Sequence, residues 1–473
     1  MRNVLWRGRA RAALPVALIA IALIAPLVAG TAVGAAPQTH GMTSAANSRA
    51  GLPAAGQLTW VKTGTVVRIA DGDTVLAKVP GEITQGIING KKVAITYGPK
   101  GEIRYRFAGI QSMERGECHA IEAQLRLAEL LPPGAKITVK ALNKESTVPN
   151  GKGDIRPLRL IFAGTGPNAV DVQAQLLREG LVLPNSVQDE IFNEQGYMKL
   201  AQEAAALGIG DWDSDHCGVG PDQSASLKIM VNYNADGNDA LYPERRFARI
   251  LNTGTQSVNI AGWYLRTGKH SRFYFPKATV IAPGGSVEVR MQDNAGKLTS
   301  GNAVFYWKTE EQGDSFINPD TSKYGIGAAY LVDPDGDIRF ESLYPCQVNC
   351  SAKWPDLSGK VSLVYESPVW PVPQTEEALV VTNTSAEAID LGYYVIDFST
   401  FGQYEFPRGT TLAAGADLRV YINKKGVAHS LKRPGASLPS KDVGWPSSWS
   451  TPTVLRSHES VVMACVKEFD LPC

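Results

Sequence analysis

The sequence predicts a multidomain, mainly β protein in which a β-barrel with interspersed helices precedes two all-β modules. Three observations support this. The chain has 473 residues, too many for one ordinary hydrophobic core, so size alone predicts about two to four domains. Residues 63–139 form short alternating or apolar stretches separated by glycine-containing turns, as β-hairpins do. Residues 248–291 and 379–422 align without gaps at an offset of 131, which indicates two copies of one module.

The first residues have the features of an export signal. Four arginines lie within residues 1–11, and residues 12–36 carry no charge and end in small residues. We expect residues 1–36 to be a signal peptide cleaved near residues 32–36, and residues 37–57 to be a flexible linker. The alternative is an uncleaved membrane anchor, because the apolar run is long enough to span, but Pro26 and the Ala/Gly-rich end favour the signal. The mature protein is then secreted, extracellular or attached to the cell surface, without a stable membrane span.

The segment 58–218 has the pattern of one domain, and ordered structure is expected to begin near Trp60. Turns at residues 89–90 and 99–101 predict hairpins. Strands with interspersed helices fit a barrel of the OB type. The expected later elements are helices at 119–131, 170–179 and 197–207 and strands at 137–140 and 158–162.

Charge excludes binding to nucleic acid by bulk electrostatics. The net charge is +1 and the pI is about 7.6, and residues 60–218 hold 18 Lys and Arg against 19 Asp and Glu. A nearly neutral domain fails the charge test for tight, non-specific nucleic-acid binders, but it still permits a local arginine clamp.

The most informative stretch is the turn Asp71-Gly72-Asp73-Thr74, which lies between two apolar strands. A strand pair would hold its two carboxylates rigidly, as a site for a hard cation beside a phosphate requires. Farther along, Arg106 precedes Glu114, and Arg156 precedes another apolar run. Carboxylate, Arg, Glu and Arg therefore follow one another in that order.

This order resembles the staphylococcal nuclease family, whose pattern is the same acidic turn, then Arg-x-x-x-x-Asp-Thr-Pro-Glu, then a Tyr-Gly-Arg-like segment. The likeness extends over about residues 60–218, including the helix-Gly turn at 176–182 and a closing Trp212. It implies an OB-fold domain that hydrolyses the phosphodiester bonds of DNA, RNA or both with calcium. The hairpin at Lys91-Lys92 lies in a segment longer than in compact family members and is interpreted as an insertion.

The resemblance also implies a role for each site residue. In the family scheme, a calcium ion and two arginines neutralise the phosphate while a carboxylate activates or orients the attacking water. The guanidinium fork suits this because it meets two phosphate oxygens at once. The implied calcium ligands are Asp73, Gln111 and Ser112, and the implied catalytic residues are Arg106, Glu114 and Arg156.

Gln111 departs from the family pattern, because it stands where a second calcium-ligating aspartate would lie. An amide oxygen still coordinates calcium, but it brings no charge and therefore weakens the site. Ser112 and Met113 replace Thr and Pro, and Arg159 is an alternative to Arg156. The rival hypothesis is therefore a catalytically eroded extracellular protein that binds nucleic acid, cell wall or another protein; a purely structural surface module is a third.

The repeat lies in the second half of the chain, and its matches include Asn252 with Asn383 and Gly284 with Gly415. Residues 225–346 resemble the lamin-tail domain, an immunoglobulin-like β-sandwich, through motifs such as Gly262-Trp263-Tyr264-Leu265. Residues 355–473 form a second, divergent copy, in which a Tyr-Tyr pair replaces Gly-Trp. Such modules would anchor the enzyme or bind a cell-surface or protein partner.

Six cysteines make an even count that suits an oxidising compartment, so disulfides are expected. A bridge from Cys118 to Cys217 would join the loop after Glu114 to the end of the domain. The alternative is a zinc site in which Cys118-His119 and His216-Cys217 supply two thiolates and two imidazoles. The spacing does not fix the pairing of the remaining candidates Cys346, Cys350, Cys465 and Cys473.

Two acidic clusters, at 234–239 and 333–337, place oxygen-bearing side chains at alternate positions, as calcium loops do. Turns closed by Asp and Asn side chains are the favoured interpretation of both, because these residues hydrogen-bond to the backbone nearby.

Overall fold

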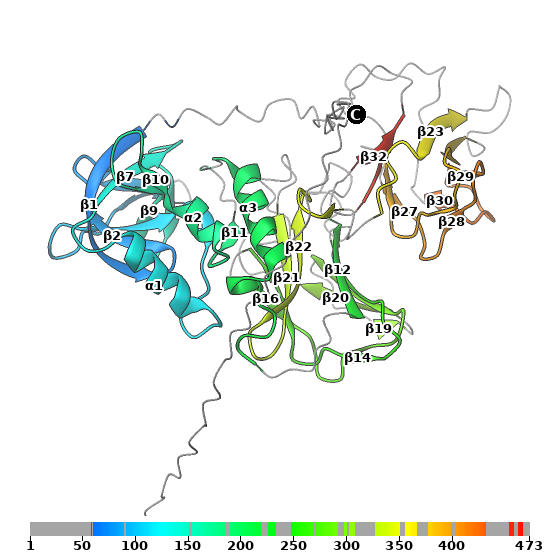
Figure 1. Ribbon diagram of the computed structural model, residues 1–473, viewed down its shortest axis with the longest axis horizontal. Helices are drawn as coiled ribbons and strands as arrows, with labels where there is room; N and C mark the ends of the chain where they lie inside the picture. Colours follow the sequence, from blue (N-terminus) through cyan, green and yellow to red (C-terminus); the bar gives the residue numbers. More distant parts are fainter. Residues whose placement is uncertain are drawn as a thin grey trace, which may run out of the picture. The chain divides into compact units, whose positions relative to one another are not determined.

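The structure is a computed structural model (Figure 1). The predicted signal peptide, linker and 234–239 cluster lie outside the residues it describes. Among the described residues, no helix is both long and apolar enough to cross a membrane. The described residues are 58, 60–88, 91–150, 154–185, 190, 192–218, 226–232, 247–268, 271–291, 298–299, 302–307, 327–350, 355–366, 377–398, 403–431, 454–457 and 462–466.

The fold is mainly β and begins with a closed barrel of five strands (Figure 1, blue to cyan). The strands hydrogen-bond in the order β9-β5-β2-β1-β7, and β7 returns to β9 to close the barrel. Only β5 and β9 pair in parallel. The barrel strands are β1 (Trp60–Asp71), β2 (Thr74–Lys78), β5 (Ile103–Phe107), β7 (Lys136–Ala141) and β9 (Ile155–Ala163).

Shorter strands flank the barrel. The predicted hairpin at Lys91-Lys92 is present, because β3 and β4 pair antiparallel. β6 pairs with β11, which brings the segment after β5 against the segment after the second helix. These elements are β3 (Gln85–Ile88), β4 (Lys91–Ala94), β6 (Gly109–Gln111), β8 (Thr147–Pro149), β10 (Val170–Asp171) and β11 (Leu183–Asn185).

Three α-helices are found among the described residues: α1 (Ala120–Leu130), α2 (Val172–Arg178) and α3 (Glu194–Leu207). α1 buries Ala120, Ala123 and Leu127, whose spacing of three and four residues places them on one face. Because α1 packs on β1, this face covers the strand that leads to the acidic turn (Figure 1).

Two predicted helix starts were wrong. α2 begins at Val172 and not at residue 170, because the Asp171 side chain accepts a 3.0 Å hydrogen bond from the Ala174 N–H and so caps the helix. α3 begins at Glu194, three residues before the predicted Tyr197. Its first turn has the mixed polar sequence Glu194-Gln195-Gly196, which carries no apolar period, and Asn193 before it has a positive φ and makes no side-chain cap.

The second module contains two sheets, one ordered β12-β13-β18-β20-β19 and the other β16-β15-β21-β22, plus the pair β14-β17. Its core includes Trp263, Leu265 and Phe275, all buried. The strands are β12 (Leu227–Asn232), β13 (Phe247–Asn252), β14 (Val258–Asn259), β15 (Tyr264–Thr267), β16 (Arg272–Tyr274), β17 (Val280–Ile281), β18 (Ser286–Met291), β19 (Leu298–Thr299), β20 (Asn302–Trp307), β21 (Gly327–Val332) and β22 (Ile338–Tyr344).

The third module repeats this plan, with sheets β23-β24-β29-β30 and β27-β26-β31-β32 and the pair β25-β28. Adding 131 to the bounds of β13, β14, β16, β17 and β18 gives those of β24, β25, β27, β28 and β29, which confirms the repeat. The strands are β23 (Val361–Glu366), β24 (Ala378–Asn383), β25 (Ile389–Asp390), β26 (Val395–Asp397), β27 (Gln403–Glu405), β28 (Thr411–Leu412), β29 (Asp417–Ile422), β30 (Ser430–Leu431), β31 (Val454–Arg456) and β32 (Val462–Cys465).

Two predicted asparagine positions show why the repeat is kept in register. The Asn252 side chain donates to the carbonyls of Gln256 and Ile281, at 2.6 and 2.9 Å. Asn383 donates to the carbonyls of Glu387 and Leu412 in the same way, at 2.7 and 3.0 Å. Each asparagine is fully buried and joins the loop after its own strand to a second strand.

Disulfides are present in the structure. Cys118 pairs with Cys217, as expected, and Cys346 pairs with Cys350. Cys465 is also disulfide-bonded. Since the sulfur atoms of Cys118 and Cys217 are bonded to each other, this structure does not form the zinc site with two thiolates.

Candidate functional site

The acidic turn is held between β1 and β2, where Asp71 pairs with Thr74. Thr74 in turn pairs with Arg106 on β5, so the barrel register sets this arginine opposite the turn. Glycine is required at position 72 because the turn lies very close to its neighbours: a Cβ there would lie 2.7 Å from the Cβ atoms of both Ser112 and Ala123. The turn is therefore pressed against the loop after β6 and against α1.

Three donors converge on one oxygen of Asp73, whose exposed fraction is 4%. Its Oδ2 lies 3.0 Å from Nη2 of Arg106, 3.1 Å from Nε2 of Gln111 and 2.8 Å from the backbone N of Ser112. Its Oδ1 accepts from the Thr74 hydroxyl at 3.0 Å. Four predicted site residues, Asp73, Arg106, Gln111 and Ser112, are thus brought together.

The orientation of Gln111 decides what this cluster can bind. Its side-chain oxygen accepts a 2.6 Å hydrogen bond from Arg106, and its nitrogen faces Asp73. Calcium takes about six to eight oxygen ligands, preferably carboxylates. Here the one buried carboxylate is neutralised by Arg106, and the Gln111 amide donates one hydrogen bond to it and one to the Ser112 carbonyl. The cluster in this arrangement does not fit calcium.

Positive charge exceeds negative charge around the turn. Arg104 lies 3.3 Å from Asp71, and Arg156 donates to the Thr74 hydroxyl at 3.3 Å. Burial and then the neighbouring Arg106 lower the pKa of Arg156. Burial and then the neighbouring Asp73 raise the pKa of Asp71. Three guanidinium groups therefore surround two carboxylates, and the guanidinium charges repel one another.

Two other predicted residues lie in different surroundings. Glu114 is exposed in the loop after β6, its backbone N–H donates to Glu117 at 2.5 Å, and its charge acts on the buried Arg266 of the second module. Arg159, the alternative to Arg156, is fully buried, with its guanidinium on Glu82 at 2.9 Å. Arg159 therefore stabilises the barrel interior and does not serve as a clamp.

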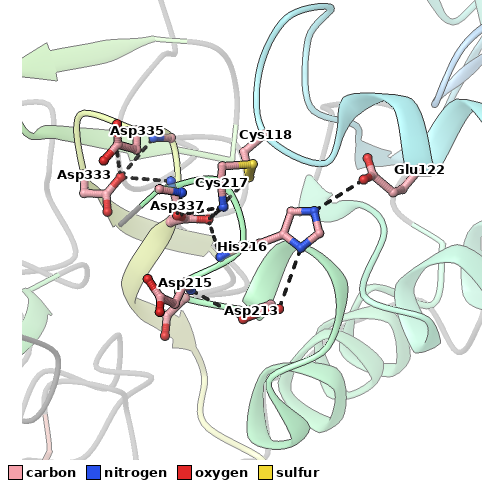
Figure 2. Close-up of a disulfide and its surroundings, with 12 residues drawn as sticks. Cys118, Glu122, Asp213, Asp215, His216, Cys217, Asp333, Asp335 and Asp337 are labelled. Carbon is pink, nitrogen blue, oxygen red and sulfur yellow. Dashed lines mark hydrogen bonds and ion pairs between the residues drawn. A yellow bond between two sulfur atoms is a disulfide. The ribbon is translucent and has the colours of Figure 1, made fainter. Parts of the chain in front are cut away.

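A second cluster lies beside the Cys118–Cys217 disulfide (Figure 2). Its two histidines were named in the sequence analysis only as part of a zinc site with two thiolates. The rings of His119 and His216 stack with centroids 4.1 Å apart. Nε2 of His216 lies 3.5 Å from a Glu122 oxygen, and Nδ1 lies 3.8 Å from Asp213. The sequence signals for this cluster were the pair Cys118-His119 before α1 and the pair His216-Cys217 at the end of the domain. No sequence pattern indicated that Glu122 and Asp213 lie beside them.

The acidic cluster at 333–337 is a turn, as the favoured interpretation predicted. One Asp333 oxygen accepts from the backbone N–H groups of Asp335, Gly336 and Asp337, at 2.9 to 3.0 Å. The Asp337 carboxylate accepts from the backbone N–H groups of His216, Cys217 and Gly218 (Figure 2). This turn thereby fixes the backbone around the disulfide.

Comparison with known proteins identifies one module. Residues 222–342 match the family model of the Lamin Tail Domain. This confirms the predicted lamin-tail-like sandwich in the second module and gives it an immunoglobulin-like fold. No curated protein matches the chain. The second module is therefore assigned by its family, and the N-terminal domain is described by its fold, a closed five-stranded barrel.

Proposed function

We propose that the barrel binds the phosphodiester backbone of single-stranded DNA or RNA at the cluster of Arg104, Arg106 and Arg156. The observation that carries this proposal is the excess of guanidinium charge around Asp71 and Asp73 in a domain that is otherwise neutral. A phosphate group placed there would offset the burial and the repulsion by Arg106, which together lower the pKa of Arg156. The acidic turn supports the proposal by holding the arginines in place.

Unsatisfied donors support the same proposal. Nε of Arg104 and Nε of Arg156 are buried and have no hydrogen-bond partner within the described part of the chain. Leaving a buried donor unpaired costs about 1–3 kcal/mol, and more for a charged group. Phosphate oxygens accept guanidinium hydrogen bonds in pairs, so a bound nucleic-acid strand would offset the cost of the unpaired donors. Arg104 is accessible to such a ligand, since 41% of its side chain is exposed.

The second candidate function is the calcium-dependent nuclease that the family resemblance implies. It is favoured by the convergence of Asp73, Arg106, Gln111 and Ser112. Calcium binding would require Gln111 to turn its oxygen toward the ion and Arg106 to release Asp73. Arg106 and Arg156 would then contact the phosphate, and Glu114 would orient the water.

Secretion and the role of the tail modules also belong to this proposal. The charge-free segment 12–36 after the N-terminal arginines supports export. The disulfides support an oxidising compartment. The lamin tail domain and the module after it would hold the barrel on a cell-surface or protein partner.

The test measures binding and cleavage together. A short fluorescent single-stranded DNA or RNA is titrated with the protein in EGTA or in millimolar calcium, and the same samples are run on a denaturing gel. We expect Arg104→Gln and Arg156→Gln each to weaken binding about tenfold. Each lost phosphate contact should also reduce the slope of log K against log salt concentration by about 0.7. The matched control is Arg178→Gln, on the exposed side of α2.

The outcomes separate the candidates. Binding in EGTA without cleavage, weakened in both cluster variants and unchanged in the control, supports the binding function. Cleavage that requires calcium and is lost in Glu114→Gln would instead support the nuclease function. Binding that is absent, or equal in the control and cluster variants, rejects a phosphate site at the arginines.

A further inference from the structure

The cluster beside the disulfide has a geometry of its own. His119 directly follows Cys118 and His216 directly precedes Cys217, so the Cys118–Cys217 bond fixes the backbones of both histidines. The two imidazoles stack with an interplanar angle of 29°. Glu122 projects from the first turn of α1 toward the His216 ring (Figure 2).

His119 carries a buried nitrogen without a partner. Its exposed fraction is 6%, and its Nε2 makes no hydrogen bond to any of the described residues. Burial and then the neighbouring His216 lower the pKa of His119. A stack that served packing alone would leave this buried nitrogen unsatisfied, which is unfavourable.

We propose that His119, Glu122 and His216 bind a divalent transition-metal ion of the zinc class. One ligand atom from each of the three residues lies within 4.8 Å of the others. Two imidazole nitrogens and one carboxylate oxygen are a donor set that zinc, cobalt and nickel accept and that calcium does not prefer. Three protein ligands leave a fourth position for water or another ligand.

The site can close around an ion with small movements. Ligand atoms on a tetrahedral zinc lie about 3.3 Å apart, given bond lengths of about 2.0–2.1 Å. The distance from His216 Nε2 to the Glu122 oxygen is already 3.5 Å. Both side chains are nearly half exposed, at 42% and 45%, so they can adjust toward the buried His119.

The surroundings support His216 as a ligand through Nε2. Asp213 lies 3.8 Å from Nδ1, on the opposite side of the ring, where a carboxylate commonly orients a metal-bound histidine. Asp337 holds the backbone N–H groups of residues 216–218 and therefore the loop itself. Cys118 and Cys217 are not ligands in this arrangement, because their sulfur atoms are bonded to each other.

The experiment uses untagged protein, with thiol titration to verify that the disulfides are intact. Zinc is titrated calorimetrically after removal of metals with a chelator, and cobalt is followed by its visible absorption, which is intense when the ion is four-coordinate. The ligand variants are His119→Gln, His216→Gln and Glu122→Gln. The controls are His429→Gln, a histidine of the third module, and Glu129→Gln, an exposed carboxylate on α1.

We expect one tight zinc per chain and a rise in melting temperature with zinc. Each ligand variant should weaken zinc binding at least a hundredfold, and Asp213→Asn should weaken it about tenfold. The control variants should bind zinc as the wild type does. His216 and Glu122 are exposed enough for their variants to fold, so a folding defect in His119→Gln leaves the test intact. The proposal is wrong if zinc does not bind, or if His216→Gln and Glu122→Gln bind it as the controls do. Nucleic-acid binding at the arginine cluster is measured separately and has no part in this result.

Discussion

The side-chain oxygen of Gln111 lies 2.6 Å from Nη2 of Arg106, and its nitrogen lies 3.1 Å from the Asp73 carboxylate. The amide therefore bridges a cation and an anion that are themselves 3.0 Å apart. A carboxylate at this position would attract Arg106 but would repel Asp73. Glutamine satisfies both partners without an ion, which is why the cluster is complete as it stands.

Gln111→Asp is expected to raise the affinity of the cluster for calcium, because two carboxylates would then face each other and attract a cation. The calcium-dependent rise in melting temperature should grow by several degrees relative to EGTA. The change is measured by thermal unfolding in both conditions. The matched control is Gln175→Asp on α2, which should show no calcium effect; an equal response in both variants would contradict the expectation.

Arg106→Leu is expected to destabilise the protein by about 3–5 kcal/mol, because it leaves the Asp73 charge buried and without its cation. Adding Asp73→Asn should recover a large part of that loss. Urea unfolding of the two variants and the pair measures this. For comparison, Arg126→Leu removes a partly exposed ion pair and should cost about 1 kcal/mol or less. Equal losses in Arg106→Leu with and without Asp73→Asn would exclude the ion pair as the cause.

Asp211 is expected to make stability fall as pH rises. It is fully buried, and burial raises its pKa to about 8, whereas the unfolded carboxyl has a pKa near 3.9. Between these values the folded protein holds a proton that the unfolded chain has lost. The free energy of unfolding then falls by up to about 1.4 kcal/mol per pH unit.

Asp211→Asn removes this titration. Its stability relative to the wild type should rise from pH 5 to pH 8, as measured by urea unfolding at several pH values. Asp213→Asn, at a half-exposed carboxylate close by in the chain, is the control. A stability difference that stays constant across this pH range would contradict a raised pKa for Asp211.

Asn252→Ala and Asn383→Ala are expected to cost similar amounts, about 1–3 kcal/mol each, because the two side chains make the same bonds to loop and strand carbonyls. Chemical unfolding of each variant measures the loss. Asn259→Ala, at an exposed position of β14, should cost less. If Asn383→Ala behaves like Asn259→Ala, the third module does not depend on this bond as the second does.

Much of the fold could be predicted because its signals are local. Alternating strands around glycine turns predicted the barrel hairpins, and a constant offset predicted that two modules share one register. The start of α2 was missed because the role of Asp171 as an N-cap depends on its hydrogen bond with the Ala174 N–H, which is seen only in the structure. The start of α3 was missed because its first turn carries no apolar pattern.

The candidate site could be predicted in membership but not in orientation. The order of motifs indicated that Asp73, Arg106 and Gln111 lie together, since barrel register aligns them. Sequence could not show that Gln111 turns its nitrogen to Asp73, because that depends on where Arg106 donates. The sequence named His119 and His216 as members of a zinc site with two thiolates, but it gave no sign that Glu122, in the first turn of α1, lies beside His216.

The equal register of the two repeated modules has a consequence for how the chain folds. β13 pairs with β18 through the same relative positions by which β24 pairs with β29. During folding, β24 therefore presents to β18 a backbone that fits as well as β13 does, and misassembly by strand exchange between tandem copies is the characteristic hazard. Side chains must provide the discrimination: Trp263 lies in the core of the second module, whereas Tyr394 takes the equivalent position in the core of the third. The sequence differences between the two copies thus favour the native strand pairing over the exchanged pairing.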